Sequence, residues 1–126
     1  MKVLLVDDNR LMLEGLQNLL EAHNIQVVGM ATDGLESVGL ARECKPDVIL
    51  MDLVMPDLDG VAATKAIKAR WPEIQVIALT SFQEGEMVQE ALKEGAISYL
   101  LKNVTGEDVL KAVRSAYDGR ATIAPE

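Results

Sequence analysis

Five short apolar runs, spaced at similar intervals, constrain the fold of this chain more than any other feature of its sequence. Each run is nearly continuous in apolar residues rather than alternating with polar ones, as expected of parallel strands covered on both faces. We therefore predict five buried strands. The runs cover residues 3–6, 27–30, 48–51, 76–79 and 97–101.

Helix-length segments separate these runs. Leu13, Leu16 and Leu20 share one face of the first segment, which is the periodicity of an amphipathic helix. A similar face in the last segment is made by Val109, Val113 and Ala116. Strand and helix alternate five times in 126 residues, which predicts a doubly wound α/β fold with a five-stranded parallel sheet and five helices.

Residues typical of helix ends flank several of these segments. Gly95 is expected to follow the fourth helix, and Trp71-Pro72 to end the third. Three polar pairs have the spacing of a capping box or a close relative of one. They are Asp33 with Glu36, Ser81 with Glu84, and Thr105 with Asp108.

Size and charge exclude several classes of protein. The length fits one domain, and no apolar run approaches the ~20 residues that span a bilayer. The net charge of −8 argues against direct nucleic-acid binding by this domain, since the phosphate backbone needs a basic surface. A lone cysteine, Cys44, and a start at Met1-Lys2 without a signal-peptide pattern favour a reducing cytoplasm.

Polar residues directly follow four of the five predicted strands. The first strand leads into Asp7 and Asp8, the third into Asp52, the fourth into Thr80 and the fifth into Lys102. The carboxyl ends of parallel strands lie at one edge of the sheet, where ligands bind in such folds. We therefore expect these five side chains to meet in one pocket.

The chemistry of that pocket follows from its charges. Asp7, Asp8 and Asp52 would repel one another, and Lys102 offsets only one of them. Mg²⁺ complements such a site, because it binds carboxylates together with phosphate oxygens. Asp52 would then act as the nucleophile. Mg²⁺ and Lys102 would hold the transferring oxygens, and Thr80 would hydrogen-bond the phosphoryl group once it is attached.

At these positions the chain resembles the receiver domain of bacterial two-component response regulators, over residues 2 to about 118. Four motifs carry the resemblance: Val6-Asp7-Asp8-Asn9, Asp52-Leu53-Val54-Met55-Pro56-Asp57-Leu58-Asp59-Gly60, Ala78-Leu79-Thr80-Ser81 and Tyr99-Leu100-Leu101-Lys102. The resemblance implies a flavodoxin/CheY-like sheet with strand order 2-1-3-4-5.

The resemblance also implies a role for each matching residue. Asp52 would accept a phosphoryl group from a phosphohistidine on a sensor histidine kinase. Asp8, Asp52 and the backbone carbonyl of Val54 would bind Mg²⁺ directly, and Asp7 would bind it through water.

The same resemblance implies a switch. Thr80 would move toward the phosphoryl group while the ring of Tyr99 turns inward, and Lys102 would contact the phosphoryl group. The domain would be no enzyme in the ordinary sense, but a phosphoacceptor that takes part in its own phosphorylation and dephosphorylation.

The sequence departs from the common receiver pattern at two positions. Asn103 stands where many receivers have a proline after a cis bond, so the Lys102–Asn103 bond is either trans, with a rearranged loop, or held cis at a cost. Asp57 replaces a frequent glycine. Separately, Val54 offers no polar group to orient water and Phe82 could shield the same side, from which we predict slow self-dephosphorylation.

The domain is expected to cover residues 1–119, with residues 120–126 starting a linker to a C-terminal helix-turn-helix DNA-binding domain. Phosphorylation would then control transcription, with a phosphorylation-dependent homodimer as one means of doing so. A stand-alone regulator that acts by protein–protein contact is the alternative.

Three alternative functions fit the residues less well. A haloacid-dehalogenase-like phosphatase carries its nucleophile in an Asp-x-Asp motif after the first strand, whereas that loop here reads Asp7-Asp8-Asn9-Arg10. A flavin or nucleotide binder would need a loop rich in glycine or in Ser/Thr at the start of the first helix. A receiver-like module that is never phosphorylated would lack an acidic or lysine site residue, and none is missing.

Overall fold

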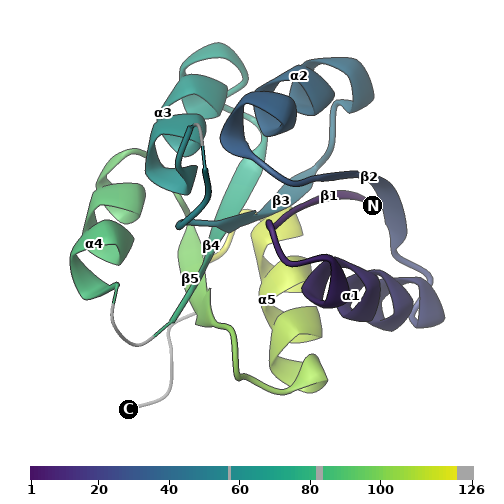
Figure 1. The fold of residues 1–126 in the computed structure, drawn as a ribbon. Helices are drawn as coiled ribbons and strands as arrows, with labels where there is room; N and C mark the ends of the chain where they lie inside the picture. The colour runs from purple at the N-terminus through teal and green to yellow at the C-terminus, as the bar shows by residue number, and fades with distance from the viewer. Residues whose placement is uncertain (57, 82–83, 122–126) are drawn as a thin grey trace.

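The computed structural model describes residues 1–56, 58–81 and 84–121. Asp57, Phe82 and residues 122–126 of the expected linker lie outside the described residues. Strands and helices alternate along the chain (Figure 1). The strands are β1 (Lys2–Val6), β2 (Gln26–Ala31), β3 (Val48–Asp52), β4 (Gln75–Thr80) and β5 (Ser98–Leu101). The helices are α1 (Arg10–Ala22), α2 (Gly34–Cys44), α3 (Gly60–Arg70), α4 (Gly85–Lys93) and α5 (Gly106–Tyr117).

All five strands are parallel and form one sheet in the order β2-β1-β3-β4-β5. This confirms the predicted doubly wound fold and its strand order. The order reverses between β1 and β3, so the ends of these two neighbouring strands flank the position where ligands bind in this class of fold.

Helices cover both faces of the sheet. Leucines of α1 and apolar residues of α5 form one core cluster with one face of the strands. Residues of α2, α3 and α4 form a second cluster on the opposite face. Figure 1 shows the same division, with α1 and α5 on one side of the sheet and α2, α3 and α4 on the other.

Burial differs between the central and the edge strands. Nearly every residue of β1, β3 and β4 is buried, as the apolar runs predict. Residues of β2 and β5 are often only partly buried, because each has a neighbouring strand on one side only. Both faces of the sheet are covered as predicted, and the two edge strands are less buried than the three central ones.

The helix starts follow the predicted pairs in two cases out of three. Asp33 caps α2 by accepting from the Glu36 N–H, and Thr105 caps α5 by accepting from the Asp108 N–H. Ser81 does not cap α4, which begins at Gly85 after Glu84. The expected helix ends are present, since α3 stops before Trp71 and Gly95 adopts a positive φ just after α4.

Two further expectations can be compared with the fold. The peptide bonds of the described residues are all trans, so the Lys102–Asn103 bond takes the trans alternative. None of the described helices is both long enough and apolar enough to cross a bilayer.

Candidate functional site

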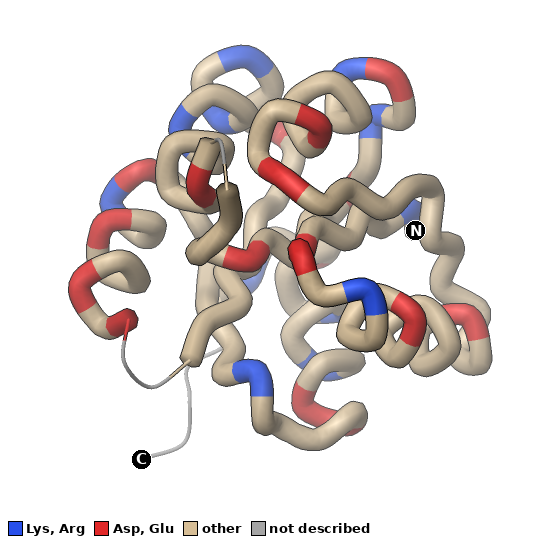
Figure 2. The backbone as a smooth tube through the Cα atoms, viewed as in Figure 1, with Lys and Arg blue, Asp and Glu red and all other residues tan. Residues whose placement is uncertain are grey.

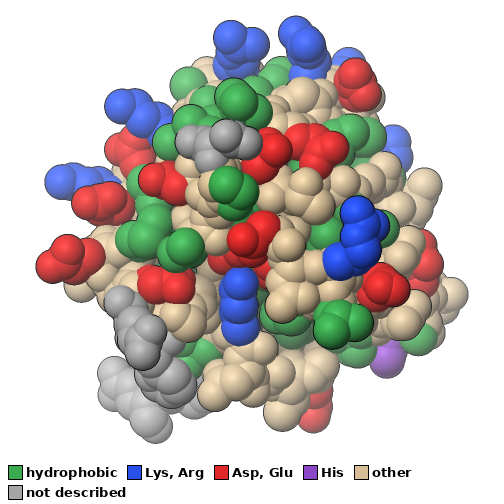
Figure 3. All heavy atoms as spheres, in the orientation of Figure 1, with side chains coloured by type: hydrophobic (Ala, Val, Ile, Leu, Met, Phe, Trp, Pro, Cys, Tyr) green, Lys and Arg blue, Asp and Glu red, His purple; other side chains and the backbone are tan. Residues whose placement is uncertain are grey.

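The five polar residues predicted at the strand ends come from neighbouring parts of the sheet edge. Asp7 and Asp8 follow β1, Asp52 is the last residue of β3, Thr80 is the last residue of β4, and Lys102 directly follows β5. One carboxylate oxygen each of Asp7, Asp8 and Asp52 lies within 4.8 Å of the others. The structure thus brings the three predicted acids together, and Figure 3 shows acidic side chains gathered beside one basic side chain on this face.

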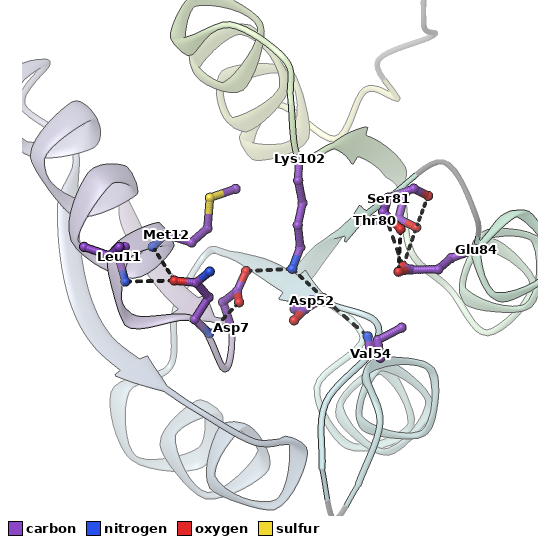
Figure 4. A network of polar contacts seen from close by, with 10 residues as sticks. Asp7, Leu11, Met12, Asp52, Val54, Thr80, Ser81, Glu84 and Lys102 are labelled. Carbon is purple, nitrogen blue, oxygen red and sulfur yellow. Dashed lines mark hydrogen bonds and ion pairs between the residues drawn. The ribbon is translucent and has the colours of Figure 1, made fainter.

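Lys102 bridges two of these acids. Its Nζ lies 3.1 Å from Asp52 Oδ1 and 3.2 Å from Asp7 Oδ2 (Figure 4). Both carboxylate side chains are buried, with exposures of 0% for Asp7 and 1% for Asp52, whereas Lys102 is 33% exposed. Lys102 therefore reaches from the surface over two acids that have little contact with water.

Backbone N–H groups of the adjoining loops orient the two buried carboxylates. The Asn9 N–H donates to Asp7 Oδ1 at 2.8 Å, and Asn9 itself caps α1 by accepting from Leu11 and Met12. The Val54 N–H donates to Asp52 Oδ1 at 3.3 Å. In the loops after β1 and β3, a backbone N–H two residues further along the chain thus orients the carboxylate of Asp7 and of Asp52.

The charges in this pocket perturb one another. Burial, reinforced by the nearby Asp7, raises the pKa of Asp52 to about 6 although Lys102 acts in the opposite direction. Burial alone would lower the pKa of Lys102, but its attraction to Asp52 and Asp7 outweighs this and raises it. The ionised form of Asp52 is therefore costly in the resting pocket, as expected where three acids share one base.

The donor set fits a divalent cation. Three carboxylates face a single ammonium group, and Mg²⁺ favours carboxylate oxygens. Asp52 Oδ2 is buried and has no hydrogen-bond partner among the described residues, and Asp7 Oδ2 has the Lys102 ammonium at 3.2 Å as its polar contact. A buried oxygen without a partner is rare without a functional reason, and a cation bound to Asp52 Oδ2 would satisfy it. Asp8 is exposed and lies at the solvent side of the cluster.

A glycine allows α3 to begin directly beside the pocket. A Cβ placed on Gly60 would collide with the backbone oxygen of Asp52 and with Leu53. The Gly60 N–H also donates to the Leu53 carbonyl at 3.0 Å. The loop after Asp52 is therefore folded back tightly onto the end of β3.

Thr80 and Tyr99, the two predicted switch residues, lie on adjacent strands. Thr80 is buried, and its hydroxyl contacts Glu84 rather than a residue of the acidic pocket. Tyr99 is partly buried and packs against the core cluster on the α4 face. The backbone of Lys102 donates to the Thr80 carbonyl at 2.8 Å, which ties the predicted switch to the lysine of the pocket.

Comparison with known proteins identifies the family of this chain. The family model described as the response regulator receiver domain matches residues 3–114. The chain belongs to this family.

Several named proteins resemble this receiver domain closely. The response regulator protein VraR of Staphylococcus epidermidis is 44% identical over 126 residues, which are 99% of this chain and 60% of VraR. The chain thus spans about three fifths of the length of the curated relatives that it matches.

Solved structures agree with this assignment. The receiver domain of the response regulator NarL from Mycobacterium tuberculosis is 33% identical with a TM-score of 0.89, covering 94% of this chain and 97% of that one. A LuxR-family response regulator from Aurantimonas is 30% identical with a TM-score of 0.91, covering 98% of this chain and 89% of that one.

Sequence reasoning missed one contact in this receiver domain. The spacing of Ser81 and Glu84 suggested a helix cap, but the Glu84 carboxylate instead accepts from the Ser81 N–H at 3.3 Å in the loop before α4. The same carboxylate also accepts from the hydroxyls of Ser81 and Thr80. A glutamate four residues after the predicted switch threonine was the only available signal.

Proposed function

We propose that this receiver domain is a phosphorylation-activated switch in which Asp52 accepts a phosphoryl group from a sensor histidine kinase. The observation that carries the proposal is the state of Asp52. Its Oδ1 pairs with Lys102 at 3.1 Å, while its buried Oδ2 has no hydrogen-bond partner among the described residues. One oxygen is thus held in place and the other keeps its lone pairs for a metal ion or for phosphorus.

The transfer step can be written from these groups. An Asp52 carboxylate oxygen attacks phosphorus and forms a P–O bond, while the P–N bond of the donor phosphohistidine breaks. The electron pair of that bond stays on the imidazole nitrogen, which takes up a proton. Asp52 must be ionised to attack. Lys102 holds a phosphoryl oxygen, as a cation does in phosphoryl transfer generally.

Mg²⁺ is the proposed cofactor. Asp8, Asp52 and the backbone carbonyl of Val54 would bind it, with Asp7 acting through water. When bound, the ion neutralises charge on the acids and on the phosphoryl oxygens. Asp7 then keeps Lys102 directed toward the pocket through their 3.2 Å ion pair.

The proposed output lies outside this domain. VraR and the NarL and LuxR-family proteins are response regulators, and the chain spans only 60% of VraR. We infer that the domain controls an attached C-terminal DNA-binding domain in the cytoplasm, with a phosphorylation-dependent homodimer as one means of doing so. A stand-alone regulator that acts by protein–protein contact is the second candidate.

A phosphoryl-transfer assay tests the central claim. The protein is incubated with acetyl phosphate, with and without Mg²⁺, and intact mass is compared between wild type and Asp52→Asn. We expect one added phosphoryl group in wild type with Mg²⁺ and none in Asp52→Asn. An unchanged phosphoryl adduct in Asp52→Asn would place the acceptor elsewhere.

A further inference from the structure

Glu84 accepts three hydrogen bonds from the end of β4. Its Oε2 accepts from the Thr80 hydroxyl at 2.8 Å and from the Ser81 N–H at 3.3 Å, and its Oε1 accepts from the Ser81 hydroxyl at 2.6 Å. In Figure 4 these three residues form a group of their own, while Lys102 points to Asp7 and Asp52. The Glu84 carboxylate thus accepts hydrogen bonds from both residues at this point of the chain, the last residue of β4 and the one directly after it.

The Thr80 hydroxyl has one proton to donate. Of its two acceptors among the described residues, the Glu84 carboxylate is nearer than the Ser81 carbonyl, at 2.8 against 3.1 Å. Hydrogen bonds to an ionised acceptor are also stronger than those to a neutral one. The proton therefore belongs mainly to Glu84 in this structure, and Thr80 cannot donate it to another anion at the same time.

We propose that Glu84 is a positioning residue that holds Thr80 in its resting orientation and competes with the phosphoryl group for the hydroxyl proton. This inference rests on the function proposed for Asp52 and Thr80. If it is correct, the resting state is stabilised by a specific hydrogen bond, between Thr80 and Glu84. That bond must break before Thr80 can turn toward a phosphoryl group.

The state of Glu84 supports this role. Burial would raise its pKa, but the hydrogen bonds from Ser81 and Thr80 outweigh burial and lower the pKa below its ordinary value. The carboxylate is therefore ionised near neutral pH, which is the form that competes best for a hydroxyl proton.

Glu84 also connects Thr80 to α4. It is the residue directly before α4, and its carbonyl accepts from the Val88 N–H at 3.0 Å in the first turn. It makes no side-chain hydrogen bond that caps the helix. Breaking the contact with Thr80 thus removes one of the links between the end of β4 and the start of α4, while the hydrogen bonds from Ser81 remain and no cap is removed from that helix.

Beryllofluoride affinity, measured by titration calorimetry with Mg²⁺ present, tests the proposal. Glu84→Ala removes both the charge and the acceptor, and we expect binding to be about threefold to tenfold tighter than in wild type. Glu84→Gln keeps an acceptor oxygen for Thr80, so it should tighten binding less. Equal tightening by the two variants would attribute the effect to charge alone and overturn the proposal.

Glu86→Ala is the matched control. Acidic residues are frequent along α4 (Figure 2), and Glu86 lies in its first turn without a hydrogen bond to Thr80 among the described contacts. It removes the same charge two residues away and should leave beryllofluoride affinity near that of wild type. A gain equal to that of Glu84→Ala would contradict a specific contact.

A double-mutant cycle shows whether Glu84 acts through Thr80. If it does, Glu84→Ala changes affinity in wild type but not in a Thr80→Ala background. The Thr80 methyl resonance of the resting protein should also shift in Glu84→Ala and stay in place in Glu86→Ala. Wild type that binds no beryllofluoride would overturn the function proposed for Asp52, whereas normal binding without a Glu84 effect would overturn only this inference.

Discussion

The α-carbon of Gly60 lies so close to the backbone carbonyl of Asp52 that no side chain fits between them. Gly60→Ala is expected to destabilise the fold by about 1–3 kcal/mol, because the new methyl group must displace backbone rather than a flexible side chain. It should also slow phosphorylation, since the displaced backbone includes that of Asp52, the proposed acceptor. Urea unfolding and intact mass after acetyl phosphate treatment measure the two effects.

Gly39→Ala provides the control for this substitution. Gly39 lies within α2, and a Cβ there would meet no atom within 4 Å. Alanine favours a helix over glycine by about 0.5–1 kcal/mol, so this variant should be more stable than wild type. If both glycine variants were equally stable, the close approach at Asp52 would carry no cost.

The raised pKa of Asp52 predicts a pH-dependent stability. The ordinary carboxyl value of 3.8 applies in the unfolded chain and about 6 in the folded one. Folding therefore favours the protonated form. This contribution to stability is complete below about pH 3.8 and is lost as pH rises through about 6.

Asp52→Asn tests that sign. Without divalent cations at pH 8, this variant should be more stable than wild type by about 3 kcal/mol, since one pKa unit corresponds to about 1.4 kcal/mol and the raised pKa already includes the opposing effect of Lys102. The difference should shrink as pH falls through about 6. Urea unfolding in EDTA measures it, with Glu43→Gln, which removes an exposed carboxylate, as the charge control.

Mg²⁺ should stabilise the folded protein, because the unfolded chain does not hold Asp7, Asp8 and Asp52 together. At about ten times the dissociation constant the gain is about 1.4 kcal/mol, which corresponds to a rise in Tm of roughly 5 °C. Thermal unfolding followed by circular dichroism measures it. In Asp8→Asn, Mg²⁺ should raise Tm much less than in wild type. If Mg²⁺ left the Tm of wild type unchanged, the proposed Mg²⁺ site would be ruled out.

Ser98 is expected to weaken the fold. Its side-chain oxygen is buried and has no hydrogen-bond partner among the described residues, so Ser98→Ala should stabilise the protein by up to about 1 kcal/mol. Ser37 is an equally buried serine whose hydroxyl donates to the Gly34 carbonyl at 2.6 Å. Ser37→Ala should instead cost about 1 kcal/mol, and chemical denaturation of both variants compares the two serines.

The phosphoryl group on Asp52 is expected to persist. Val54 is 49% exposed and lies two residues after the proposed acceptor, Asp52, where its apolar side chain cannot orient an attacking water. Decay of radiolabelled protein without a phosphatase measures the lifetime. Val54→Asn should shorten it several-fold by supplying a polar group, and loss of the label from wild type within seconds would contradict the prediction.

The sequence predicts much of this fold because its signals are local. Continuous apolar runs locate β1, β3 and β4, and the residue after each strand points to one edge of the sheet. Sequence is less informative where contacts between separate parts of the chain decide the structure. The apolar runs do not show that β2 and β5 are edge strands and therefore less buried. Ser81 does not cap α4 as predicted, and its hydroxyl, like that of Thr80, donates to the Glu84 carboxylate. Spacing alone does not encode which acceptor a hydroxyl finds.

The acids and the lysine of the pocket are far apart in the chain, and this has a consequence during synthesis. Asp7, Asp8 and Asp52 are all translated before β5 and Lys102. A nascent chain that has reached only β4 therefore holds the repelling acids without the ammonium group that offsets them. Fragments that end before β5 therefore cannot complete the pocket.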